Sequence, residues 1–172
     1  MPRYKTIKIK EEAVLDIAED AIRGYRVPYK QERMGFLLGY LKGPVVYEGI
    51  PYRGGEKTRT QIVFDRIKLF ERGNELAMQR KKKVIGLYHT HPEQGGERCY
   101  TLSEEDKDSF LANPYLVEMV VAVGPNLVET DFEIHYNQDG SLTMRYSNHY
   151  LRYTIFYKRE NKVKKGIIKI VP

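Results

Sequence analysis

The sequence contains one cysteine among its 172 residues, four histidines and no tryptophan. A single cysteine can form neither an internal disulfide nor a Cys-rich zinc finger, so the disulfide-rich secreted class is excluded. A transition metal held by this protein would therefore depend mainly on the histidines and on carboxylates.

Long apolar runs are also missing. The longest, residues 117–123, is interrupted by Glu118 and is far shorter than the roughly 20 residues that span a bilayer. Residues 1–10 lack the apolar core of a signal peptide. We therefore expect a cytoplasmic protein without a membrane partner.

Acidic residues are outnumbered, with 29 Lys and Arg against 23 Asp and Glu and a net charge of +6 at pH 7. This balance favours acidic partners in general. Six Asn and five Gln beside so many charged residues are typical of a heat-adapted source, a thermophile. Two basic clusters, residues 80–83 and 158–165, could contact nucleic acid, but they fit a solvated helix end and a solvated hairpin tip better. We do not expect a nucleic-acid partner.

Hydrophobic periodicity and turn residues predict interleaved helices and strands. Helices are expected over 11–23, where Gly24 ends the pattern, over 69–83 and over 103–111. Strands are expected over 34–41, 45–52, 60–64, 84–88, 116–123, 132–136, 142–146, 151–157 and 167–171. Because hairpins dominate, the prediction is an α/β sandwich with a mixed, largely antiparallel sheet flanked by helices. Residues 1–150 would form the main domain, and 151–172 a basic C-terminal strand pair that is part of this domain or packs on it.

The most informative stretch holds two histidines, His89 and His91, at the end of a predicted strand. Residues at i and i+2 of a strand project from the same face. Two imidazoles placed in this way can bind one zinc ion at about 2.0–2.1 Å. The alternative for a His-x-His pair taken alone is two exposed polar residues at a strand end.

Downstream, Ser103 and Asp106 have the spacing of a capping box, in which the serine caps a helix and the acid bonds back to the serine amide. Thr101 is a competing cap. In the functional interpretation, Asp106 lies on the first helical turn and faces the two histidines as a third ligand. Three protein ligands leave one tetrahedral position open, as in catalytic zinc sites.

Together these residues resemble a known family. The stretch Gly86-Leu-Tyr-His89-Thr-His91-Pro92, followed by Ser103-x-x-Asp106, is similar to the signature of the JAMM, or MPN-plus, zinc metalloproteases. The upstream glutamate of that signature is matched by Glu32, three residues before Gly35. The resemblance covers residues 31–123 and extends to archaeal JAMM proteases and the proteasome-lid deubiquitinase. It implies an MPN (cytidine-deaminase-like) fold for the main domain.

The resemblance also implies roles for five residues. His89, His91 and Asp106 would hold one Zn²⁺ per chain, Glu32 would be the general base, and Ser103 would donate a hydrogen bond to the oxyanion. Such an enzyme is an isopeptidase or peptidase that cuts after the C-terminal glycine of ubiquitin or a ubiquitin-like modifier, as deubiquitinases and desampylases do, and proteasome-related partners are a further implication. Relatives that lack activity act as scaffold or binding subunits, which is the alternative; a basic nucleic-acid-associated protein on the same fold is a third.

One departure from the family concerns the loop over residues 93–101. Eleven residues separate His91 from Ser103, more than the family usually has. The inserted loop contains Cys99, which could act as a redox switch or fourth ligand, although a surface cysteine without a role is the simpler interpretation. The two remaining histidines, His135 and His149, are expected to face solvent.

Overall fold

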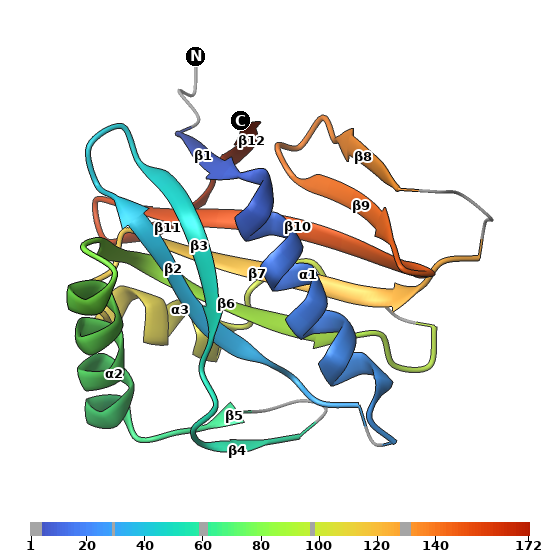
Figure 1. Ribbon diagram of the computed structural model, residues 1–172, viewed down its shortest axis with the longest axis horizontal. Helices are drawn as coiled ribbons and strands as arrows, with labels where there is room; N and C mark the ends of the chain where they lie inside the picture. Colours follow the sequence, from blue (N-terminus) through green and yellow to red (C-terminus); the bar gives the residue numbers. More distant parts are fainter. Residues whose placement is uncertain (1–4, 29, 59–61, 97–98, 128–131) are drawn as a thin grey trace.

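The computed structural model describes residues 5–28, 30–58, 62–96, 99–127 and 132–172. Within these ranges the chain forms three helices and twelve strands (Figure 1). In chain order they are β1 (Thr6–Lys10), α1 (Glu11–Arg26), β2 (Met34–Tyr40), β3 (Val45–Pro51), β4 (Glu56–Lys57), β5 (Ile62–Val63), α2 (Arg66–Gln79), β6 (Lys83–Pro92), α3 (Glu104–Ala112), β7 (Val117–Pro125), β8 (Glu133–Tyr136), β9 (Leu142–Tyr146), β10 (His149–Arg159), β11 (Lys162–Lys165) and β12 (Ile167–Val171). No helix among the described residues has the length and apolar character needed to cross a membrane.

Ten of the described strands form one mixed sheet, in the order β12-β1-β3-β2-β6-β7-β10-β9-β8, with β11 paired to β10. Pairs β1–β12, β1–β3 and β6–β7 are parallel, and the other pairs of this sheet are antiparallel. The sheet is curled, so that its two ends approach each other: the Ile168 amide of β12 donates to the Gly140 carbonyl in the turn between β8 and β9. The predicted α/β class with a largely antiparallel sheet is confirmed.

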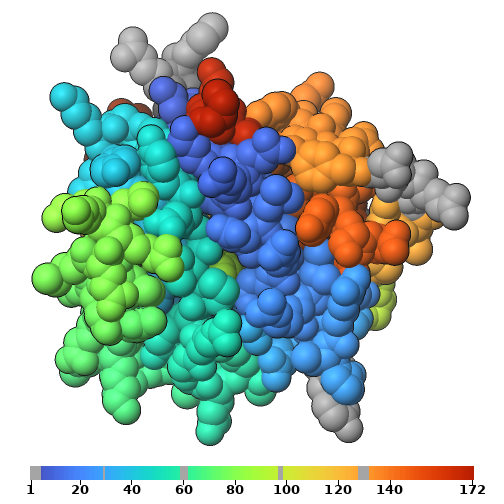
Figure 2. Space-filling view, in the orientation of Figure 1, coloured from blue at the N-terminus to red at the C-terminus, as the bar shows by residue number. Residues whose placement is uncertain are grey.

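The helices cover opposite faces of the sheet. Helix α1 packs in the curl, where Ile17 and Ala21 join a core with Leu37 of β2 and Tyr88 of β6. Figure 2 shows α1 crossing this face of the molecule, in blue. On the other face, Phe36 of β2 packs with α2, and α3 packs through a smaller cluster against β7 and β10. Alternating side chains of a strand therefore enter different cores, as the pleat requires.

Helices α1 and α2 have boundaries that differ from the prediction. Helix α1 continues through Gly24 to Arg26 and ends at Val27, because Pro28 disfavours the helical conformation of the residue before it. Helix α2 begins three residues earlier than predicted, since the Asp65 carboxylate accepts hydrogen bonds from two backbone amides of the first turn. It ends at Gln79, before Lys81 adopts a left-handed conformation with φ 53°. The basic run at residues 80–83 thus follows the helix.

The predicted pairing at the C-terminus was wrong. Strand β10 does not pair with β12: it lies between β7 and β9 and also pairs with β11, the basic segment that the sequence suggested as a turn. Strand β12 instead pairs in parallel with β1 at the far edge of the sheet. Residues beyond position 150 thus belong to the same sheet as those before it. Of the strand predicted over 60–64, residues 60 and 61 lie outside the described residues, and β5 accounts for Ile62 and Val63.

Candidate metal centre

Two neighbouring strands bring the predicted site residues together. In the antiparallel pair β2–β6, Met34 lies opposite His89, and Thr90 and Arg33 exchange hydrogen bonds just beyond the regular ladder. Glu32, which immediately precedes this segment, is thereby held beside His91. Because side chains alternate along β6, His89 and His91 project to the face opposite α1, while Tyr88 enters the α1 core.

The first turn of α3 supplies the third predicted ligand. The Ser103 hydroxyl accepts a hydrogen bond from the Asp106 amide at 3.1 Å, and the Ser103 amide donates to Asp106 Oδ2 at 3.1 Å. This is a complete capping box. The same Oδ2 lies 3.3 Å from His89 Nε2 and 4.0 Å from His91 Nε2. The cap and the proposed ligand are therefore not alternatives, because the cap aims the Asp106 carboxylate at the histidines.

His89, His91 and Asp106, here called the ligand cluster, fit a divalent metal ion. One ligand atom from each lies within 4.8 Å of the other two. Tetrahedral ligands bonded to zinc at 2.0–2.1 Å are about 3.3 Å apart, close to the shorter of these distances. His89 Nε2 is buried and faces Asp106 Oδ2 at 3.3 Å without the geometry of a hydrogen bond. A buried polar atom that lacks a well-formed hydrogen bond is costly, and coordination to a cation would satisfy it.

Glu32 lies next to the ligand cluster but outside it. Its Oε1 atom is 4.0 Å from His91 Nε2, and its backbone amide donates to the Thr58 carbonyl at 2.6 Å. Burial raises the pKa of Glu32 to about 7, and the negative charge of Asp106 adds to the rise while His89 opposes it. A carboxylate with such a pKa can accept and release a proton near neutral pH.

Glu118 is a further member of this centre that the sequence analysis did not identify. It lies on β7, is buried, and its Oε1 atom is 3.1 Å from His89 Nδ1. This contact occupies Nδ1 and leaves Nε2 to face Asp106, the arrangement in which a second carboxylate orients a metal-binding histidine. Burial raises the pKa of Glu118. Its position in the sequence could have identified Glu118, because an acid that interrupts a buried apolar strand needs a partner.

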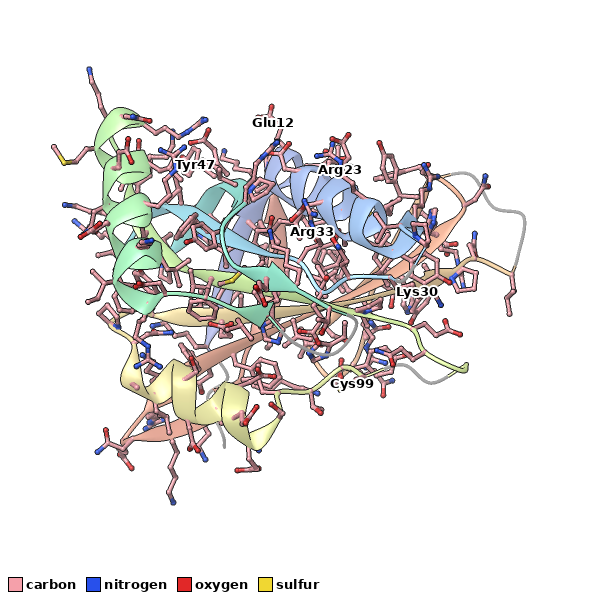
Figure 3. All side chains as sticks on the ribbon, turned by 90° about the horizontal axis from the view of Figure 1, so that it is seen from below. Glu12, Arg23, Lys30, Arg33, Tyr47 and Cys99 are labelled. Atoms are coloured by element: carbon pink, nitrogen blue, oxygen red, sulfur yellow. The ribbon has the colours of Figure 1, made fainter. Side chains whose placement is uncertain are left out.

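The inserted loop contributes through its backbone. His91 Nδ1 lies 3.3 Å from the Cys99 carbonyl, so Nε2 of His91 is the nitrogen directed at Asp106. The Cys99 thiol is exposed and points to the Thr101 carbonyl at 3.5 Å. Figure 3 shows Cys99 on the segment that leads to α3. The group of potential ligands among the described residues does not include Cys99.

The electrostatics of the centre favour a cation. Burial alone lowers the pKa of His89, but the carboxylates of Asp106 and Glu118 outweigh it and raise the pKa to about 10. Burial and the charge of His89 lower the pKa of His91 to about 4. Contact with His89 holds the pKa of Asp106 well below its usual range, although burial opposes this. Acidic groups that retain a proton on one buried imidazole would also stabilise a metal ion in its place.

A cavity of about 90 Å³ adjoins the ligand cluster. Its wall combines the charged groups of the centre with apolar side chains from β2, β5 and β6; the lining residues are Glu32, Met34, Ile62, Phe64, Leu87, His89, Asp106, Ser109, Asn113 and Glu118. Polar groups that converge beside apolar walls are typical of small ligand sites.

The other two histidines lie away from this centre. His135 on β8 is exposed, as predicted. The prediction for His149 was wrong, because this residue is buried with 7% of its surface exposed. Its ring packs nearly perpendicular to that of Tyr25 from α1, with the ring centres 5.5 Å apart, and burial lowers the pKa of His149. A helix distant in the sequence therefore removes His149 from solvent.

Comparisons with known proteins bear on the fold. No protein-family model matches the sequence, and no curated protein matches it. The solution structure of protein DSY2949 from Desulfitobacterium hafniense is similar with a TM-score of 0.61 and 14% identity, over 96% of this chain and 92% of that one. The crystal structure of AF2198, a JAB1/MPN domain protein from Archaeoglobus fulgidus, aligns with a TM-score of 0.48 and 17% identity, over 95% and 98%. This chain thus shares its fold with DSY2949.

Proposed function

We propose that this protein is a zinc metallopeptidase of the JAMM type that hydrolyses the peptide or isopeptide bond after the C-terminal glycine of a ubiquitin-like modifier. The observation that carries the proposal is the convergence of Glu32, His89, His91 and Asp106, which come from three separate segments of the chain. These four residues and Ser103 match the family signature in kind and order.

Each residue of the centre has a chemical task in this proposal. Zinc supplies Lewis acidity and lowers the pKa of a bound water to about 7. Glu32 takes a proton from the attacking water and returns it to the leaving amine, as its place beside the ligand cluster allows. Ser103 retains its hydroxyl proton for donation to the oxyanion, since its oxygen accepts from the Asp106 amide. The extended tail of the modifier would bind as an added strand near β5 and the cavity.

The proposal is tested with a ubiquitin-fold protein whose C-terminal glycine is joined to the lysine side chain of a fluorescent peptide. We expect about one zinc per chain and cleavage after the glycine, lost with a zinc chelator and restored by added zinc. Glu32→Gln should retain zinc and lose about 10²–10⁴-fold in rate, the usual contribution of a general base. Glu105→Gln, an exposed acid beside Asp106 on α3, is the matched control and should cleave normally.

Several outcomes would contradict the proposal. A wild-type protein that binds no zinc would remove the metal site, and full activity of Glu32→Gln would remove Glu32 as the base. Zinc binding without cleavage of any ubiquitin-fold conjugate would favour the alternative, a scaffold or binding subunit that retains a metal site.

A further inference from the structure

The face of the sheet opposite the ligand cluster holds one buried acid, Asp20 of α1, which is 2% exposed. Among the described residues only Asp20 and Glu118 are buried acids. A buried ion pair contributes little to net stability, because desolvation offsets the attraction, so a charge within an apolar helix interface needs another explanation. Each of the two acids contacts a residue of β6: Glu118 contacts His89, and Asp20 contacts its neighbour Tyr88.

Asp20 bonds the neighbours of two site residues. Its Oδ1 atom accepts a hydrogen bond from Arg33 Nε at 3.0 Å, and its Oδ2 atom accepts from the Tyr88 hydroxyl at 2.7 Å. Arg33 follows Glu32 in the sequence, and Tyr88 precedes His89. Successive side chains of a strand point to opposite faces of the sheet. Hydrogen bonds that hold one residue on one face therefore also restrain the position of the adjacent residue, whose side chain lies on the other face. Figure 3 shows Arg33 between α1 and the sheet.

The backbone transmits this restraint to the site. The Arg33 amide donates to Thr90 Oγ1 at 2.8 Å, and the Thr90 amide donates to the Arg33 carbonyl at 2.8 Å. Thr90 is fully buried and lies between the two histidine ligands. A fixed Arg33 therefore fixes the segment of Glu32 against that of His89 and His91.

Two glycines leave the space that these bonds need. A Cβ at Gly24 of α1 would overlap the stem of the Arg33 side chain, and a Cβ at Gly35 of β2 would overlap the Tyr88 ring. The glycine at position 24 thus lets α1 approach the Arg33 side chain. This role agrees with the observation that Gly24 lies within α1 and does not end it. The glycine at position 35 lets the Tyr88 ring lie against β2 and direct its hydroxyl to Asp20.

We propose that Asp20 is a positioning residue. Its hydrogen bonds hold Arg33 and Tyr88 on the face of the sheet opposite the ligand cluster, and thereby fix Glu32 and His89 in the positions that the metal site requires. This inference rests on the proposed function, because it takes the ligand cluster to bind a metal ion. The hydrogen bonds of the Asp20 side chain go to Arg33 and Tyr88, so it acts on the site through these neighbours of Glu32 and His89. Misplacement of catalytic groups by fractions of an ångström is enough to lower a rate severalfold.

The test compares Asp20→Asn and Tyr88→Phe with a matched control, Tyr153→Phe. Tyr153 is also fully buried, and its hydroxyl donates to the Val14 carbonyl of the same helix at 3.0 Å. Tyr88→Phe and Tyr153→Phe should lower the midpoint of thermal unfolding by similar amounts. Only Asp20→Asn and Tyr88→Phe should weaken zinc binding, by about tenfold, as losses around metal ligands do, and lower kcat with KM unchanged.

A readout that needs no metal separates position from stability. Amide hydrogen exchange at Arg33 and Thr90 should become faster in Asp20→Asn and Tyr88→Phe and stay unchanged in Tyr153→Phe. If zinc affinity, kcat and exchange in Tyr88→Phe match those of Tyr153→Phe, the inference is overturned, and this holds even where Asp20→Asn fails to fold. A wild type that binds no zinc would instead overturn the proposed function, together with the part of the inference that concerns metal.

Discussion

Two groups of side chains in this protein are each built around an aspartate, and they differ in how completely its charge and the neighbouring polar atoms are paired. In the ligand cluster, His89 Nε2 lies buried without a hydrogen bond beside an acid and a second histidine. At the turn between β8 and β9, Asp139 bonds to the Ser141 hydroxyl and amide, to Arg152 at 2.8 Å and to Lys165 at 3.0 Å. We call Asp139, Ser141, Arg152 and Lys165 the Asp139 cluster.

The difference lies in what each group leaves unsatisfied. The Asp139 cluster pairs one carboxylate with two cations at a partly exposed turn, and it joins that turn to β10 and β11. In the ligand cluster and its surroundings, three acids, Glu32, Asp106 and Glu118, surround the buried imidazole of His89 and the partly buried imidazole of His91. Three acids gathered at a partly buried site favour a cation between them. We infer that the Asp139 cluster stabilises the fold and that the ligand cluster serves binding.

The largest expected effect comes from His89→Ala. Zinc content should fall from about one ion per chain to none, because only two protein ligands remain and the nitrogen that faces Asp106 is gone. Metal analysis of the purified protein measures this. The exposed histidine on β8 provides the control, and His135→Ala should retain its metal. Equal zinc in both variants would place the metal elsewhere.

Next in size is Glu118→Gln. The amide oxygen can still accept from His89 Nδ1, but the charge that favours a cation is lost, so zinc should bind about 10–100-fold more weakly. Competition with a chelating dye measures the affinity. Glu133→Gln removes a comparable acid from an exposed ion pair with Arg145 and should bind zinc normally. Unchanged affinity in Glu118→Gln would show that Glu118 does not support the site.

Asp139→Asn should act on stability and leave zinc affinity unchanged. The ion pairs of the Asp139 cluster are partly exposed, so their loss should lower the free energy of unfolding by about 1 kcal/mol or less. Urea unfolding at pH 7 measures this difference. A loss of zinc from this variant would contradict the separation between the two groups.

The smallest effect is the pH dependence of that same difference. Although burial opposes it, bonds from Ser141, Lys165 and Arg152 hold the pKa of Asp139 well below its usual range in the folded protein. A lowered pKa adds stability above the pKa of the unfolded chain, about 3.9, and that stability is lost as the pH falls towards the folded pKa. The gap between wild type and Asp139→Asn should therefore be constant from pH 7 to 5 and shrink below about pH 4. A gap that widens in acid would be inconsistent with this pairing.

Local features of the sequence were predicted well. The helix start at Ser103 and the capping box with Asp106 depend on contacts between residues three positions apart. The strand that carries His89 and His91 pairs with distant strands, but its short apolar pattern marked it in the sequence. The motif also singled out Glu32, which no periodicity could have separated from the other acids and which the structure places 4.0 Å from His91. Short-range spacing decides these features, because side-chain direction follows from the period of the strand or helix.

Tertiary structure alone decided the rest. The pairing of β12 with β1 depends on the curl of the whole sheet, and His149 is buried because α1 places Tyr25 against it. Likewise Asp20 and Glu118 approach β6 from opposite faces, although nothing near them in the sequence names their partners. The sequence by itself determined which residues could bind a metal. Only the folded chain decided which buried acids support those residues, because burial and charge pairing depend on segments far apart along the chain.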